Sequence, residues 1–150
     1  IAFMLIGASP GSTGGGVKTT TFAVVAKSVM TTVSGGEDVN MGNRRVPQEI
    51  VSKAVAIVLL AVVLVLVGTL ILTRTESRPF MDLLFEVISA FGTVGLTRGI
   101  TPSLSVAGKL VIAFMMFVGR VGPVSLAVAL TGKGKESGRI RYPQEKISVG

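Results

Sequence analysis

The sequence predicts an all-α membrane protein that contains a spanning helix, a short re-entrant helix and a second spanning helix. Three observations predict this fold. Of 150 residues, 49% are hydrophobic and 15% are charged, against roughly 25% charged in an ordinary soluble domain. One uncharged run is long enough to cross a bilayer. A second helical segment, which ends in a glycine-rich stretch, is too short to cross it. We therefore expect one full repeat of this pattern, preceded by the second half of another.

The composition also excludes several classes of function. The chain contains no His and no Cys, so a Ser-His or Cys-His catalytic pair cannot form within it, and a zinc site lacks its usual ligands. Its formal net charge is +7, but the basic clusters lack the interleaved aromatic residues of a nucleic-acid surface. They flank long apolar runs, as the positive-inside rule predicts for cytoplasmic loops. These basic residues are Arg44, Arg45, Lys53, Lys133, Lys135, Arg139, Arg141 and Lys146.

Residues 1–46 form the first predicted unit, the second spanning helix of a repeat, interrupted by glycines and followed by a cytoplasmic linker. Ile1–Ala8 is apolar and lacks an initiator Met and a basic region, so we do not expect it to act as a signal peptide. A glycine-rich stretch follows, then a helical segment over Val17–Val33 and a polar linker to Pro47. We expect the chain to begin within a membrane helix and to be the C-terminal piece of a larger protein.

Residues 47–131 form the predicted full repeat, and its first helix is Ala54–Thr73. This run carries no charge and lies between Pro47 and Arg74. It would span about 30 Å, the thickness of a hydrocarbon core. Because it is apolar on every face, it predicts a membrane-spanning helix rather than one side of a soluble core.

The last helix of the repeat is predicted within the apolar run Leu110–Gly132, which contains one charge, Arg120. An arginine near the bilayer centre costs at least ~2.5 kcal/mol, so it should face protein or water. Gly119, Gly122 and Pro123 surround it and predict a bend or break at that depth. Residues 132–150 are predicted to form a basic cytoplasmic tail.

Between these helices, Phe80–Phe91 has apolar residues at helical spacing. Pro79 suits the first helical position, Ser77 is a candidate cap, and Asp82 suits the positive end of the helix dipole. Twelve residues reach only about 18 Å, so this helix cannot cross the membrane. It is followed by the extended stretch Gly92–Gly99.

The residues after this short helix suit cation binding. A cation that leaves water needs its hydration shell replaced, and backbone carbonyls can do that. Thr93, Val94 and Gly95 supply carbonyls, and Gly95 can adopt the positive φ that such a stretch needs. The negative C-terminal end of the short helix would favour a cation there. The alternative to a cation site is an ordinary glycine turn between helices.

The Gly11–Gly16 run has the glycine content of a phosphate-binding loop. However, the nucleotide pattern requires Lys directly after its second Gly, and Val17 separates Gly16 from Lys18. A flexible linker is the other alternative, but an apolar run precedes these glycines. Backbone without helical hydrogen bonds is tolerated within a membrane only where protein or water meets it.

Two stretches resemble one family. FEVISAFGTVGLTRGITP, followed by GRVGP, resembles the last repeat of the Trk/Ktr/HKT potassium transporters. IGASPGSTGGGVKTTTF resembles the glycine-rich intramembrane loop of that family's third repeat. Within the family, the closest likeness is to the membrane subunit of bacterial Ktr systems. The resemblance covers nearly the whole chain, with both motifs in the expected order.

The resemblance implies four channel-like repeats around one pore, each with one filter strand. Here the filter residues would be Thr93, Val94, Gly95 and Leu96, with K⁺ bound by the carbonyls of the first three. The gate would consist of Gly11, Ser12, Thr13, Gly14, Gly15, Gly16 and Arg120. Leu96-Thr97 stands where tetrameric channels have Tyr-Gly, which argues against a self-assembling two-helix channel and for a less strictly selective filter.

Arg120 has a natural partner in the glycine-rich loop, because a guanidinium offers five donors and the loop offers unpaired carbonyls. The resemblance likewise implies that this arginine contacts the loop and the pore and adds a positive barrier to cations. Snorkelling is the weaker explanation, since Arg120 is about eleven residues from either end of its run. Glu86 is expected to hydrogen-bond behind the filter in a structural role.

The resemblance further implies passive K⁺ transport rather than enzymatic activity, by a multi-pass homodimer in the bacterial inner membrane. K⁺ is the transported ion, Na⁺ a candidate activator, and no organic cofactor binds this chain. The expected partners are membrane lipid and a cytosolic KtrA-like RCK ring that binds ATP/ADP or NAD(H); nucleic acid is not one. Two alternatives stay open: a small homotetrameric cation channel, and a membrane scaffold whose basic tail, Lys133–Lys146, binds anionic lipid or a soluble protein.

Overall fold

The computed structural model describes residues 2–9, 14–36, 39–41 and 44–122, and it is predominantly helical in these ranges. Two short strands form an antiparallel hairpin between the second and third helices. In chain order, the elements are α1 (Ala2–Leu5), α2 (Thr19–Val33), β1 (Asn40–Met41), β2 (Arg44–Arg45), α3 (Gln48–Thr75), α4 (Phe80–Gly92), the 3₁₀ turn η1 (Thr101–Ser103) and α5 (Val106–Val121).

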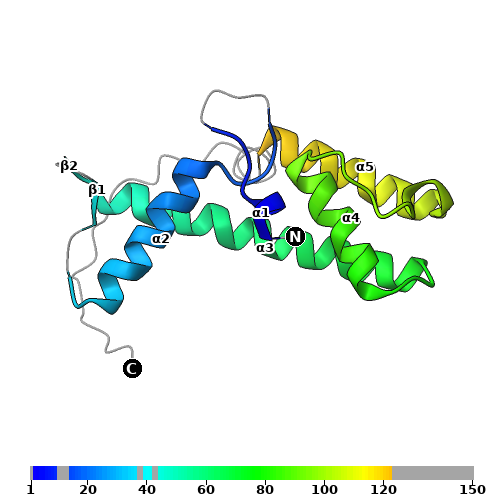
Figure 1. Ribbon diagram of the computed structural model, residues 1–150, viewed down its shortest axis with the longest axis horizontal. Coiled ribbons are helices and arrows are strands. Elements are labelled where there is room, and N and C mark those ends of the chain that lie inside the picture. Colours follow the sequence, from blue (N-terminus) through cyan, green and yellow to red (C-terminus); the bar gives the residue numbers. More distant parts are fainter. Residues whose placement is uncertain (1, 10–13, 37–38, 42–43, 123–150) are drawn as a thin grey trace, which may run out of the picture.

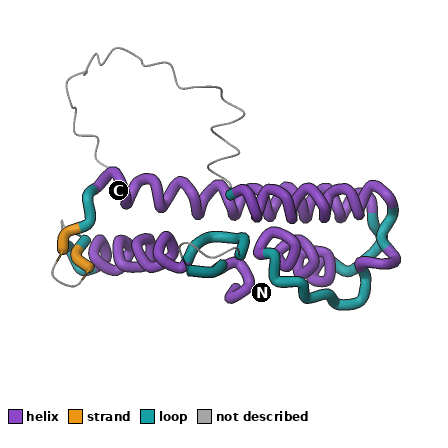
Figure 2. Tube along the Cα trace, turned by 90° about the horizontal axis from the view of Figure 1, so that it is seen from above, coloured by secondary structure: helices purple, strands orange, loops and turns teal. Residues whose placement is uncertain are grey.

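The helices lie in two layers along α3. Figure 2 shows α3 and α5 in one layer and α2, α1 and α4 in the other. The helix α2 packs on the N-terminal half of α3, while α4 and α5 pack on its C-terminal half (Figure 1). The C-terminal ends of α4 and α5 meet beside the middle of α3 (Figure 1). The main core lies between these three helices and includes Leu72, Leu83, Val87, Phe91, Met115 and Val118.

The long helix α3 begins at Gln48, six residues before the expected start. The expectation followed the uncharged run, but Glu49 stabilises the positive end of the helix and Lys53 is tolerated within it. The helix has 28 residues and spans about 42 Å. It is the one helix in the described ranges that is long and apolar enough to cross a membrane. Large side chains such as Leu66 and Leu70 are exposed along it.

The short helix α4 agrees closely with its prediction and extends one residue further, to Gly92. Asp82 lies in its first turn, as expected. The prediction that Ser77 caps the helix is wrong: Pro79 occupies the cap position and no side chain caps the first turn. Because Pro79 is extended, with φ −56° and ψ 137°, it directs the chain into the helix without being its first residue.

The helix α5 starts at Val106, four residues earlier than the expected run, because Ser105 caps it. The Ser105 hydroxyl accepts a hydrogen bond from the Gly108 N–H, at 3.0 Å. The helix ends at Val121, where Gly122 has φ 91°, which agrees with the break expected beside Arg120. The rest of the apolar run, from Pro123, and the basic tail lie outside the described residues.

The N-terminal unit differs from its prediction at two places. The helix α2 begins at Thr19 rather than Val17, because Val17 forms a parallel bridge with Ile6 instead. The expected polar linker contains the β1–β2 hairpin, in which Asn40 pairs with Arg45. Val46 donates to the carbonyl of Val39 at 2.8 Å and closes this hairpin.

Candidate filter segment and glycine-rich loop

The candidate filter starts at the turn that ends α4. The Thr93 N–H donates to the carbonyl of Ala90 and the Val94 N–H to that of Ser89, at 3.0 and 2.9 Å. This pair of bonds is the Schellman motif, whose left-handed position is usually a glycine. Here Thr93 occupies it, with φ 52° and ψ 37°. The motif satisfies carbonyls at the end of α4 and turns the chain into the following segment.

The next residues leave main-chain oxygens without hydrogen-bond partners among the described residues. Gly95 has φ 80°, which confirms the positive φ expected there. Within the part of the chain that the structure describes, the carbonyl oxygens of Thr93, Val94 and Gly95 accept no hydrogen bond. Such oxygens are the groups that can replace water around a cation.

Ser89 holds the far end of this segment. Its hydroxyl donates to the Leu96 carbonyl at 2.5 Å and accepts from the Leu96 N–H at 3.0 Å. Both main-chain groups of Leu96 are therefore fixed to α4, and its carbonyl is engaged by protein. Sequence reasoning missed Ser89; the available signal was a hydroxyl within the apolar short helix.

Glu86 fixes the next part of the segment. Its side chain is buried on α4, with 4% of its surface exposed. One carboxylate oxygen accepts from the Thr97 hydroxyl at 2.5 Å and from the Arg98 N–H at 2.9 Å. The other accepts from the Thr101 hydroxyl at 2.7 Å. These three bonds place Glu86 behind the segment, in the structural position that the sequence predicted.

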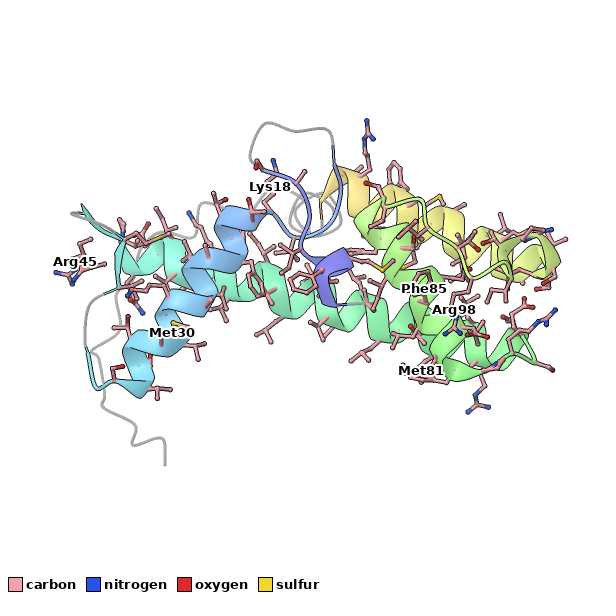
Figure 3. The ribbon with its side chains drawn as sticks, in the orientation of Figure 1. Lys18, Met30, Arg45, Met81, Phe85 and Arg98 are labelled. Carbon is pink, nitrogen blue, oxygen red and sulfur yellow. The ribbon has the colours of Figure 1, made fainter. Side chains whose placement is uncertain are left out.

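An ion pair at the surface also links the candidate filter segment to α4. The Arg98 guanidinium lies 2.9 Å from the Asp82 carboxylate, and both side chains are partly exposed. In Figure 3, Arg98 lies beside α4. An exposed pair of this kind contributes at most about 1 kcal/mol, so the buried contacts of Glu86 and Ser89 hold the segment more firmly.

The described part of the glycine-rich loop, Gly14–Gly16, lies against this site. The Gly15 N–H donates to the Thr93 hydroxyl at 2.7 Å. The Gly16 N–H donates to the Gly119 carbonyl, on α5, at 3.2 Å. A Cβ on Gly15 would lie 2.7 Å from the Thr93 side chain, so only glycine permits this approach. The other predicted gate residues, Gly11, Ser12 and Thr13, lie outside the described residues.

Arg120 is exposed and lies one residue after the carbonyl that holds Gly16. Its guanidinium makes no hydrogen bond with any residue in the described ranges, so the expected contact with the loop stays a prediction. Arg120 lines a cleft of about 680 Å³ together with three candidate filter residues. The other lining residues include Glu86, Ser89, Ile112, Met116 and Phe117.

No three His, Cys, Asp or Glu side chains in the described ranges gather closely enough to hold a metal ion. A long apolar helix, exposed aliphatic side chains and irregular backbone packed between helices are features found in helical membrane proteins.

Comparison with known proteins places the chain within that class. Residues 1–139 match the model of the TrkH family, described as a cation transport protein. The chain belongs to this family, which confirms the resemblance inferred from the two glycine-containing motifs.

Several relatives are potassium uptake proteins by name. The chain is 39% identical over 150 residues to Ktr system potassium uptake protein B of Bacillus subtilis (strain 168), covering 100% of this chain and 33% of the relative. It is 42% identical over 149 residues to Ktr system potassium uptake protein D of the same organism, covering 99% and 33%. It is 37% identical over 152 residues to potassium/sodium uptake protein NtpJ of Enterococcus hirae, covering 98% of this chain and 34% of the relative. The chain spans about a third of the length of these relatives.

Proposed function

We propose that the full-length protein carries K⁺ across a bacterial cell membrane through a pore to which Thr93–Leu96 contributes one filter strand. The carbonyls of Thr93, Val94 and Gly95 are the K⁺ ligands. The names of the relatives, which are potassium uptake proteins, support K⁺ as the transported ion. No covalent bond changes in this process, so the protein is a transporter and not an enzyme.

One observation carries the proposal. Three consecutive main-chain oxygens accept no hydrogen bond within the described residues, although both ends of their segment are fixed to α4. In a membrane, a free carbonyl costs several kcal/mol unless water, protein or an ion meets it. A rigid segment with free oxygens is therefore suited to replace the hydration shell of a cation.

The placement of α4 supports its role as a re-entrant pore helix. It starts near the C-terminal end of α3, and the segment after it leads back to α5, which begins near that same end (Figure 1). The C-terminal end of α4 lies beside the middle of α3 and brings the negative end of its dipole to the candidate filter. Both features suit a cation held part-way across the membrane.

The glycine-rich loop is the proposed gate. Gly11, Ser12, Thr13, Gly14, Gly15 and Gly16 would obstruct the pore below the filter, and Arg120 would add a positive barrier. The contacts of Gly15 with Thr93 and of Gly16 with Gly119 support this position. Small residues allow such a loop to lie close to a narrow path.

The assembly is part of the same proposal. A membrane homodimer would be controlled by a cytosolic, KtrA-like RCK ring that binds ATP/ADP or NAD(H). The relatives' naming as parts of a Ktr system supports a multi-component assembly. The name of NtpJ includes sodium, which supports Na⁺ as a second ion to test, either as activator or as cargo.

Flux through liposomes tests the function. We expect the full-length wild-type protein to carry K⁺ and the Arg120→Ala variant to carry more, because the substitution removes a positive barrier from the path. Shortening Gly11–Gly16 should raise flux as well. Arg74→Ala also removes a positive charge, in the last turn of α3 and away from the proposed gate, and is therefore the control. Absence of wild-type flux would refute the transport function, and unchanged flux in both gate variants would refute the gate.

A further inference from the structure

Thr93 has a backbone conformation that its side chain disfavours. It is the one residue other than glycine with positive φ in the described ranges. A β-branched residue rarely adopts this left-handed conformation, because its Cβ crowds the neighbouring carbonyl. Glycine at the same position of the Schellman motif would remove that strain. Retaining a threonine here therefore points to a use for its side chain.

That use is a contact with the glycine-rich loop. The Thr93 hydroxyl accepts the hydrogen bond of the Gly15 N–H at 2.7 Å, between residues 78 positions apart. Two neighbouring amides are held as well: Gly16 by the Gly119 carbonyl and Val17 by the Leu5 carbonyl. Of these three acceptors, Thr93 alone contributes a side chain. The other two are main-chain oxygens, which no substitution removes.

We propose that Thr93 is a positioning residue whose hydroxyl holds the Gly14–Val17 segment in its resting place against the filter. This inference rests on the proposed function, in which the same loop is the gate. Because one residue contributes a filter carbonyl and the acceptor for the loop, displacement of the loop releases a bond at the filter itself. Loop position and filter conformation are then coupled through a single side chain.

A buried cysteine reports the position of this segment. Val17 is 2% exposed, and its main-chain bonds do not depend on its side chain. We would introduce Val17→Cys into full-length protein with any other cysteines removed, reconstitute it in liposomes, and measure its modification rate by a water-soluble thiol reagent. This readout needs no ion transport, so it separates failure of this inference from failure of the transport function.

Three substitutions at Thr93 isolate the hydroxyl. Thr93→Val keeps the shape and branching but removes the acceptor, and should raise the modification rate by about two- to tenfold, the factor that corresponds to one hydrogen bond. Thr93→Gly removes the acceptor and suits the left-handed backbone, so it should fold readily and give the same increase. Thr93→Ser keeps a hydroxyl and should restore a rate close to that of the parent.

Val87→Cys is the matched control, because this residue is fully buried on α4 and faces α3, where a Cβ on Gly68 would lie 3.4 Å from it. Its modification rate should not change with the residue at position 93. Equal Val17→Cys rates with and without the Thr93→Val substitution would overturn the inference. So would a Thr93→Ser rate as high as the Thr93→Val rate, or a parallel increase at Val87→Cys, which would indicate general loosening of α4.

Discussion

At the scale of single residues, the candidate filter depends on side chains that lie behind it. Ser89 fixes Leu96, and Glu86 fixes Thr97, Arg98 and Thr101. Glycine placement and the position of Glu86 were predictable from the sequence. Ser89 and the left-handed Thr93 were not, because hydrogen bonds between a helix and a returning segment have no fixed spacing along the chain.

Gly95 provides the residue-scale prediction. Its φ is 80° and the space around a Cβ is open, and the same is true of Gly99, with φ 85°. An alanine at either position therefore meets a conformational cost of about 1–2 kcal/mol without a steric clash. Gly95→Ala should lower K⁺ over Na⁺ preference by about tenfold, the factor that corresponds to ~1.4 kcal/mol. Competitive flux in liposomes measures this preference.

Gly99→Ala is the control, because Gly99 has the same backbone cost but contributes no carbonyl to the proposed K⁺ ligands. Its K⁺ over Na⁺ preference should stay at the wild-type value. Equal losses of selectivity in the two variants would show that positive φ matters throughout the returning segment. Gly95 would then have no specific role as a filter residue.

At the scale of elements, helix type was easier to predict than helix ends. The apolar runs predicted α3 and the described part of α5, and helical spacing predicted α4, but α3 and α5 both begin before the uncharged run does. The reason is that helix starts depend on caps such as Ser105 and on tolerated charges such as Lys53. Apolar content detects the part of a helix that lies in lipid, whereas hydrogen bonding decides where the helix begins.

The crossing of α4 and α5 provides the element-scale prediction. A Cβ on Gly119 would overlap the Phe91 carbonyl oxygen, so the helices would have to separate. Gly119→Ala should destabilise the protein by about 1–3 kcal/mol, the usual cost of overpacking. The control is Gly68→Ala, where the added Cβ would meet the flexible Met115 sulfur at 3.1 Å. Thermal unfolding of full-length protein in detergent measures both, and equal Tm values would contradict the close crossing.

At the scale of the whole molecule, a pore requires that each connection reach a particular side of the membrane. The chain spans about a third of the length of its relatives, and large apolar side chains such as Leu66 and Leu70 are exposed on it. Sequence composition predicted a membrane protein, and two motifs predicted the family. The proposed arrangement of repeats around a pore would depend on contacts between distant segments, and composition carries no information about such contacts.

Cysteine labelling tests that arrangement. Ser77 precedes α4 in the sequence and Pro102 follows it, and both are exposed. Gln48 is exposed at the N-terminal end of α3. If α4 is re-entrant, Ser77→Cys and Pro102→Cys should react with a membrane-impermeant reagent from the same side, and Gln48→Cys from the opposite side. Reaction of Ser77→Cys and Pro102→Cys from opposite sides would show that the segment between them crosses the membrane.

The most direct test of the central claim is to locate the ion. Crystals of the full-length protein, grown with Tl⁺ in place of K⁺, would show bound ions by anomalous diffraction. We expect a peak in contact with the carbonyl oxygens of Thr93, Val94 and Gly95, on an axis shared with other parts of the protein. Anomalous peaks found only elsewhere, with Thr93–Leu96 on the periphery of the molecule, would contradict the assignment of this segment as a filter strand.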